Sequence, residues 1–217
     1  MAFVLGQNQV YYSTVLSSVP WASHGFGTAT GSPVQNDAHA SLHQTHSDHV
    51  LFIEQSGEKQ DDGDGLITRT LGLWISIRTA DCLPILLIDP DNRAIAAVHA
   101  GWRGTAAQIS RAAVASMVER FGSKPTTLLA AIGPGIDHCC FEVGEEVATH
   151  FEPFTDRKTG KAHVNLKAAN LHQLLGSGLS KANVDVSPLC TVSSPGFHSF
   201  RRNRTEGRMV SAVQIST

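Results

Sequence analysis

Two uninterrupted apolar segments near the middle of the chain restrict its possible folds more than any other feature. They are Pro84–Asp89 (PILLID) and Ala94–His99 (AIAAVH). Apolar runs without polar alternation are typical of strands that are buried on both faces. Because a short turn at Asp91-Asn92 joins the two segments, we expect an antiparallel pair of strands inside a layered structure.

A helix is expected after this pair, since apolar residues recur at helical spacing from Ala106 to Phe121. Thr105 and Gly122 are suitable residues for its N-cap and its C-terminal end. Shorter patterns predict further elements on both sides. These are strands at Leu73–Ile77, Leu128–Ile132 and Arg208–Ile215, and helices over Gly144–Phe151 and after an N-cap at Asn165.

The order of these elements mixes hairpin-like strand pairs with helices, which favours an α+β protein over regular βαβ winding. The chain has 217 residues, no internal repeat and no clear linker. We therefore expect a single domain over residues 1–217.

Composition excludes two classes of partner. The formal net charge is −2, so nucleic-acid binding through bulk electrostatics is not expected. No apolar run approaches the roughly 18 residues of a membrane span, and the N-terminal segment lacks the features of a signal peptide. We expect a cytoplasmic protein without a membrane partner, in which the four cysteines are reduced thiols.

Cys82 and His99 are the first candidates for chemistry. Cys82 precedes one strand of the expected pair and His99 ends the other, so the hairpin places them side by side. A thiolate next to an imidazole can act as a nucleophile and its base. The same two groups can instead be ligands of a metal such as zinc. The residues alone leave both interpretations open.

A third ligand is available from four histidines spaced 4, 3 and 3 residues apart, at a spacing that lets several share a helical face. Their spacing does not select one among them. With one of them, the site has two histidines and a cysteine, which leaves the fourth zinc position open for water or substrate. The four residues are His39, His43, His46 and His49.

Arginines supply candidate anion contacts. Arg103 lies in Gly101–Thr105, at a strand-to-helix junction where free backbone N–H groups attract phosphate or carboxylate. A second group near the C-terminal end contains Arg201, Arg202, Arg204 and Arg208. Glu142 is a candidate general base, although it also suits the start of a helix.

Seven motifs in this order resemble the YfiH/laccase-domain family, which has also been called the multicopper polyphenol oxidoreductase and the peptidoglycan editing factor family. HAGWRGT together with TADCLP is the most specific part of the resemblance. The motifs are QTHS (44–47), DGLIT (64–68), TADCLP (79–84), HAGWRGT (99–105), IGPGI (132–136), CFEVG (140–144) and SFRR (199–202).

The resemblance implies a mixed α/β sandwich and a zinc site made of His46, Cys82 and His99. It also implies phosphorolysis of adenosine, inosine, guanosine and methylthioadenosine, and deamination of adenosine, with purine nucleosides and phosphate as partners. The laccase label implies copper and the oxidation of phenols instead. The editing-factor name implies a non-catalytic partner-binding role. A metal-free cysteine hydrolase that uses Cys82 and His99 is a further alternative.

The N-terminal part departs from the family pattern. His24 begins a segment that resembles the family's start, but Ala29 stands at the usual arginine position and Gly31-Ser32 replaces a glycine pair. A stretch that normally precedes the first motif is also missing, so the family domain is expected to have a shortened N-terminal region. We expect His24, Glu142, Arg103 and Arg202 to contact substrate or phosphate.

Overall fold

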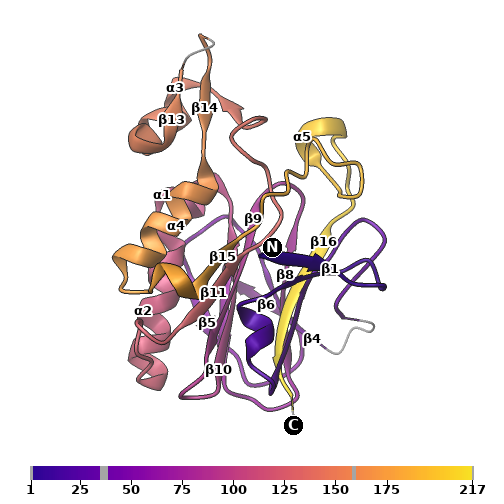
Figure 1. Cartoon of the computed structure of the whole chain (residues 1–217), viewed down its shortest axis with the longest axis vertical. Helices are drawn as coiled ribbons and strands as arrows, with labels where there is room; N and C mark the ends of the chain where they lie inside the picture. Colours follow the sequence, from indigo (N-terminus) through magenta and orange to yellow (C-terminus); the bar gives the residue numbers. More distant parts are fainter. Residues whose placement is uncertain (1, 35–38, 158–159, 217) are drawn as a thin grey trace.

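The computed structural model describes residues 2–34, 39–157 and 160–216 and contains two large β-sheets (Figure 1). The first sheet has seven strands, and the C-terminal strand lies between two strands from the first 80 residues of the chain. In spatial order they are β1 (Phe3–Leu5), β2 (Tyr11–Ser13), β3 (Ala22–Phe26), β16 (Met209–Ile215), β8 (Trp74–Thr79), β4 (His39–His43) and β6 (Gly57–Asp62).

The second large sheet has six strands and pairs them in both directions. Its spatial order is β15 (Val184–Val186), β11 (Leu129–Ile132), β9 (Leu83–Asp89), β10 (Ala94–Ala100), β7 (Gly65–Thr68) and β5 (Val50–Phe52). A small third sheet projects beyond the ends of the other two (Figure 1). It consists of β12 (Glu142–Val143), β14 (Ala162–Val164) and β13 (Thr155–Asp156).

The central hairpin confirms the prediction made from the two apolar segments. β9 and β10 are antiparallel and fully buried along their whole length. Ile85 and Val98 belong to a core shared with the helices, whereas Leu86 and Ala97 belong to a core shared with the seven-stranded sheet. The six-stranded sheet is therefore the middle layer of a sandwich, and the lack of polar alternation follows from burial on both faces.

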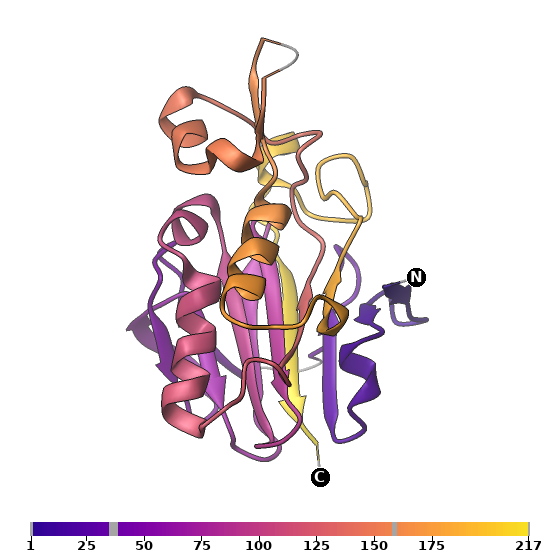
Figure 2. The ribbon, with the colours of Figure 1, turned by 60° about the vertical axis from the view of Figure 1, so that its left-hand side comes forward.

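The helices cover the outer face of the six-stranded sheet (Figure 2). The main ones are α2 (Ile109–Phe121) and α4 (Leu166–Gly176), preceded by the short α1 (Trp102–Ala106). Asn165 caps α4 as expected, since its side chain accepts a hydrogen bond from the Ala168 N–H at 2.9 Å. The remaining helical segments are η1 (Leu16–Ser18), α3 (Glu145–Ala148), η2 (Thr149–Phe154), η3 (Lys181–Asn183) and α5 (Phe200–Asn203).

The prediction of one helix from Ala106 with Thr105 as its N-cap is wrong. Helix α1 begins earlier, after Gly101, and a residue in the left-handed region, Gln108 (φ 67°), separates it from α2. The Thr105 carbonyl accepts a hydrogen bond from the buried side chain of Gln173 at 2.7 Å. This tertiary contact competes with the helical hydrogen bond to residue 109 and interrupts the helix. Gly122 (φ 70°) ends α2 as expected.

The shared helical face suggested for the four histidines is also not observed. Residues 39–43 form strand β4, and His46 and His49 lie in the loop between β4 and β5. The expected helix over residues 144–151 is divided into α3 and η2, while the strand predictions at 73–77, 128–132 and 208–215 agree with β8, β11 and β16 to within two residues. Among the described residues, no helix has the length and hydrophobicity required to cross a membrane.

His24 lies in β3 and is only 5% exposed. Its Nε2 accepts a hydrogen bond from the Ser13 N–H at 2.9 Å, which joins β3 to β2. Burial lowers its pKa to about 4, and the weaker effects of Ser13 and of the Asp185 carboxylate do not offset this. The imidazole is therefore neutral at neutral pH and stabilises the N-terminal part of the seven-stranded sheet.

We expect the free energy of unfolding to fall as the pH is lowered from about 6.5 to about 4. In this interval the unfolded chain binds a proton at His24 and the folded chain does not, so protonation favours unfolding by up to about 3 kcal/mol. Urea unfolding at several pH values measures the slope. The His24→Gln variant removes the titrating group and should flatten it, and an unchanged slope in this variant would contradict the assignment.

Candidate metal site and cavity

A cavity of about 490 Å³ opens where the two large sheets meet α1, α5 and the loop after β11. It combines a cluster of metal-ligand side chains with arginines and aromatic rings. The lining residues are His43, Gln44, His46, Arg78, Ala80, Asp81, Cys82, His99, Trp102, Ile136, Phe141, Leu166, Phe200, Arg201 and Arg208.

His46, Cys82 and His99 converge in the wall of this cavity. One ligand atom from each lies within 4.8 Å of the other two. The hairpin register accounts for two of them, since His99 is opposite Pro84, two residues beyond Cys82. His46 comes from the loop after β4 and takes a left-handed backbone conformation (φ 62°) that is uncommon for a residue with a side chain.

Asp64 holds two of the three ligand-bearing segments. It is fully buried just before β7, and its carboxylate accepts hydrogen bonds from the N–H groups of Thr45, His46 and Ser47 at 3.2, 3.0 and 2.6 Å. The same carboxylate accepts a hydrogen bond from Nδ1 of His99 at 2.6 Å. Because Nδ1 carries this proton, Nε2 of His99 is left to face the other two ligands.

The charges of these groups are strongly coupled. Burial opposes ionisation of Cys82, but His99 and His46 stabilise the thiolate and lower its pKa to about 6. Burial disfavours the charged form of His99, yet the Cys82 thiolate and the Asp64 carboxylate raise its pKa to about 9. The pKa of Asp64 lies far below its usual range, because hydrogen bonds from His99 and Ser47 outweigh its burial.

The donor set fits a zinc ion. Two imidazole nitrogens and one thiolate are ligands that zinc prefers, and three protein ligands match catalytic rather than structural zinc sites. A carboxylate bound to the outer nitrogen of a ligand histidine is the usual support for such a site. The group therefore provides a possible metal site in the wall of the cavity.

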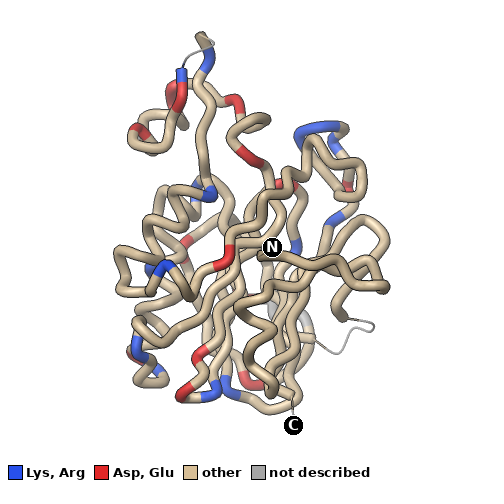
Figure 3. Tube along the Cα trace, in the orientation of Figure 1, with Lys and Arg blue, Asp and Glu red and all other residues tan. Residues whose placement is uncertain are grey.

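The rest of the wall carries positive charge and apolar surface. The guanidinium groups of Arg78, Arg201 and Arg208 line the cavity together with the rings of Trp102 and Phe141. Figure 3 shows basic residues gathered along the segment of α5, at the end of the large sheets. Such a wall can bind a ligand that has an aromatic part and an anionic part.

Asp81, next to Cys82, fixes this wall to the sheet. Its carboxylate accepts hydrogen bonds from the Arg201 backbone N–H at 2.6 Å and from Oγ1 of Thr191 at 2.7 Å. The Arg201 side chain donates to the carbonyl oxygen of Glu142 at 2.8 Å. The α5 segment that carries Arg201 is thus attached to the ligand-bearing hairpin through one carboxylate.

Two of the predicted anion contacts lie outside the cavity wall. Arg103 is exposed, and its guanidinium lies 4.4 Å from the centre of the Trp102 ring. Arg202 donates to the carbonyl oxygens of Thr191, Val192, Ser194 and Phe197 at 2.6–3.2 Å, so it holds the 191–197 loop together.

His24 and Glu142 are not cavity-lining residues either. His24 is buried between strands of the seven-stranded sheet, as described above. Glu142 is exposed in β12 and forms an ion pair with Lys161 at 2.7 Å. The geometry thus offers no support for the predicted contacts of these two residues with substrate.

Sequence analysis assigned no role to Asp64 or Arg78 and did not single out Arg201 and Arg208 within their cluster. Asp64 begins one of the seven motifs, which was the available signal for its importance. The arginines gave no comparable signal, because adjacent residues of a short helix point in different directions and the sequence does not show which direction faces the cavity. Arg201 and Arg202 are adjacent, yet one lines the cavity and the other binds backbone oxygens.

Fold and site together define a mixed α/β sandwich protein with a His–Cys–His group in an arginine-rich cavity. A family model described as multi-copper polyphenol oxidoreductase laccase matches residues 26–216. The chain belongs to this family, as the resemblance of its motifs predicted.

Relatives of this chain carry the names of purine enzymes. A purine nucleoside phosphorylase of Bacteroides thetaiotaomicron is 38% identical over 192 residues, which cover 79% of this chain and 71% of the relative. An adenosine deaminase named RL5, from an unknown prokaryotic organism, is 38% identical over 178 residues, which cover 73% of this chain and 68% of the relative. This chain is therefore similar in sequence to proteins named as purine nucleoside phosphorylases and to one named as an adenosine deaminase.

Solved structures confirm the fold. YlmD from Geobacillus stearothermophilus superimposes with a TM-score of 0.88 at 22% identity and covers 100% of this chain and 99% of its own. The Bacillus licheniformis protein YfiH gives a TM-score of 0.87 at 24% identity, with 98% of both chains covered. At this identity the likeness concerns the fold alone.

We expect Asp64→Asn to weaken zinc binding about 10- to 100-fold. An amide cannot supply the negative charge that orients His99, and it accepts fewer of the N–H groups that hold His46. The measurement is competition for zinc with a chromophoric chelator. Asp61→Asn, at an exposed position of β6, is the matched control and should bind zinc like the original protein. Equal affinities of the two variants would contradict the supporting role of Asp64.

Proposed function

We propose that this protein is a zinc-dependent purine nucleoside enzyme that uses the cavity around His46, Cys82 and His99. The observation that carries the proposal is the position of this His–Cys–His group in the wall of a cavity of about 490 Å³ that arginines also line. The names of the relatives support the substrate class. The reactions we propose are phosphorolysis of adenosine, inosine, guanosine and methylthioadenosine, and deamination of adenosine.

The three ligand residues would hold the metal through the two imidazoles and the Cys82 sulfur. A lowered Cys82 pKa favours this, because a cysteine binds metal as the thiolate. When bound, zinc would supply Lewis-acid activation at the one open coordination position. Asp64 keeps the proton of His99 on Nδ1 and so keeps Nε2 available as a ligand.

Different parts of the cavity wall would bind the purine base and the phosphate. The rings of Trp102, Phe141 and Phe200 offer apolar faces for a planar purine. Arg78, Arg201 and Arg208 offer N–H donors for phosphate and would hold it beside the ribose. Deamination needs only the purine subsite and water, so one cavity can serve both reactions.

A second candidate function is a metal-free cysteine hydrolase. The lowered pKa of Cys82 and the adjacent His99 favour it, since they form a thiolate–imidazole pair. It requires no contribution from His46, whose ligand atom nevertheless faces the same point. A hydrolase of this kind keeps its turnover in the presence of a chelator, and Cys82 is alkylated rapidly in the native protein.

Product analysis distinguishes the proposed reactions. With adenosine and phosphate, we expect purified zinc-loaded protein to form adenine and ribose 1-phosphate, whereas inosine formed without phosphate reports deamination. Zinc-loaded protein that converts no purine nucleoside would contradict the proposal. Oxidation of a phenol by copper-loaded protein would favour the laccase interpretation. If the protein converts neither a nucleoside nor a phenol, a non-catalytic partner-binding role would be favoured.

We expect Cys82→Ser to lose both zinc and turnover, because serine replaces the thiolate with a much weaker zinc ligand. Metal analysis and the product assay measure the two losses on the same sample. Cys139→Ser, at an exposed cysteine outside the cavity wall, is the control and should retain the activity. A Cys82→Ser protein with full zinc and full turnover would rule out the proposed site.

We expect Arg208→Gln to raise KM for phosphate at least about tenfold, because a charge-assisted hydrogen bond is lost. Among the described residues, its guanidinium donates hydrogen bonds to the nearby carbonyl oxygens of Thr205 and Gly207, so the substitution should not disturb the fold. Arg103→Gln, which lies outside the cavity wall, should leave this KM unchanged. If Arg103→Gln raises KM for phosphate and Arg208→Gln does not, Arg103 is the phosphate contact, as predicted from the sequence.

A further inference from the structure

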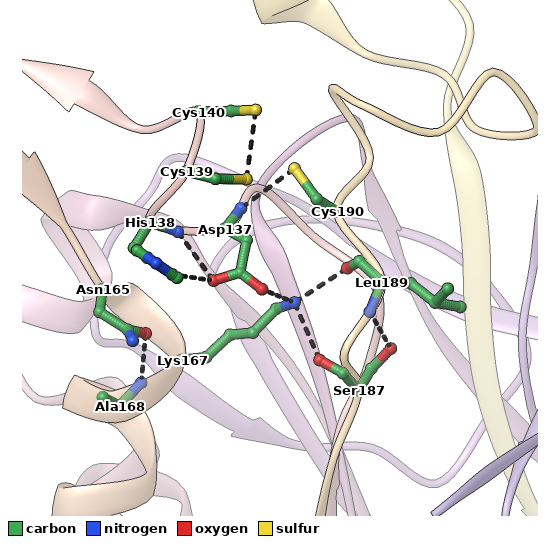
Figure 4. Close-up of polar contacts among 10 residues, drawn as sticks. All are labelled: Asp137, His138, Cys139, Cys140, Asn165, Lys167, Ala168, Ser187, Leu189 and Cys190. Carbon is green, nitrogen blue, oxygen red and sulfur yellow. Dashed lines mark hydrogen bonds and ion pairs between the residues drawn. The ribbon is translucent and has the colours of Figure 1, made fainter.

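Three cysteines meet at a second place, which the proposed nucleoside chemistry does not use. Cys139 and Cys140 follow β11, and Cys190 follows β15, about 50 residues later. The sulfur atoms of Cys139 and Cys140 are 3.4 Å apart, and all three sulfurs lie within 4.8 Å of one another (Figure 4). Cys82 is not part of this group.

The two cysteine-bearing segments are held together by the backbone. Gly135 and Cys190 form a parallel β-bridge, and the Thr191 N–H donates to the Gly135 carbonyl oxygen at 3.1 Å. The Asp137 N–H donates to the Cys190 sulfur at 3.4 Å. One β-bridge and two hydrogen bonds therefore hold the segment that leads to Cys139 and Cys140 against the segment of Cys190.

A buried lysine reinforces this arrangement. Lys167 of α4 is 4% exposed, and its ammonium group donates to the Asp137 carboxylate at 2.8 Å. It also donates to the carbonyl oxygens of Ser187 and Leu189, both at 2.9 Å (Figure 4). One cation thus fastens the segment before Cys139 to the segment before Cys190. The segments that carry the three cysteines are therefore held in place by hydrogen bonds to Asp137, Ser187 and Leu189.

The three cysteines differ in their exposure. Cys190 is buried, and the Asp137 N–H donates a hydrogen bond to its sulfur at 3.4 Å. Cys139 is exposed and Cys140 is partly exposed, so an ion from solution can reach the group. A buried sulfur with two accessible partners is suited to capture an ion at the surface.

We propose that Cys139, Cys140 and Cys190 form a second metal site, which binds one thiophilic ion, monovalent copper, through three thiolates. The donor set contains only sulfur, which selects soft ions over magnesium, calcium or manganese. Three thiolates can by themselves coordinate monovalent copper, whereas zinc held by three protein ligands takes a water or substrate as its fourth ligand. Separations between 3.4 and 4.8 Å place the sulfurs around a single ion.

The test uses the full-length chain with Cys82→Ser, which removes the thiolate of the other candidate site. The protein is reduced, and its free thiols are counted before monovalent copper is added without oxygen against a chromogenic copper chelator. We expect one tightly held copper ion per chain. Adding Cys139→Ser or Cys190→Ser to this protein should weaken copper binding at least about tenfold, since one of three ligands is lost.

Alkylation followed by mass spectrometry supplies a second measurement. Copper should protect Cys139, Cys140 and Cys190 together. Because Cys139 is exposed, its substitution keeps the experiment valid if Cys190→Ser does not fold. The proposal is overturned if the Cys139→Ser addition leaves copper affinity unchanged, if copper binds without protecting these thiols, or if zinc protects them and monovalent copper does not. These outcomes are independent of nucleoside turnover.

Discussion

The carboxylate of Asp64 is the interaction on which the candidate site depends. It is buried at the start of β7 and accepts hydrogen bonds from the His99 ring and from three consecutive backbone N–H groups at residues 45–47. Its own carbonyl oxygen also accepts from the His99 N–H at 2.7 Å. One side chain therefore positions two of the three ligands and compensates for the unusual backbone conformation of His46.

Close backbone approach completes this arrangement. A Cβ atom on Gly101 would lie 2.9 Å from the His46 ring and 3.1 Å from the Cys82 sulfur. A Cβ atom on Gly104 would lie 2.8 Å from the Ser47 carbonyl oxygen. The loop that carries His46 thus packs directly on the start of α1, and only glycine permits this contact at both positions.

Sequence analysis identified features that depend on local pattern. The hairpin over residues 84–99 and the meeting of Cys82 with His99 followed from apolar runs and a short turn. It failed where a distant side chain decides the outcome. Gln173 interrupts the expected helix by binding the Thr105 carbonyl oxygen, and Arg202 turns to backbone oxygens that no pattern in the sequence places nearby. The choice of His46 came from the family resemblance rather than from its spacing.

The place of β16 in the seven-stranded sheet has a consequence for folding. This strand pairs with β3 on one side and β8 on the other, so residues 209–215 join residues 22–26 to residues 74–79. Pairings between such distant segments make loop closure costly and slow the folding of a chain. During synthesis, β3 leaves the ribosome long before its neighbour exists. The edge of β3 that binds β16 in the folded protein therefore stays unpaired until residues 209–215 have been synthesised. In this partly folded state the chain is exposed to aggregation and to binding by chaperones.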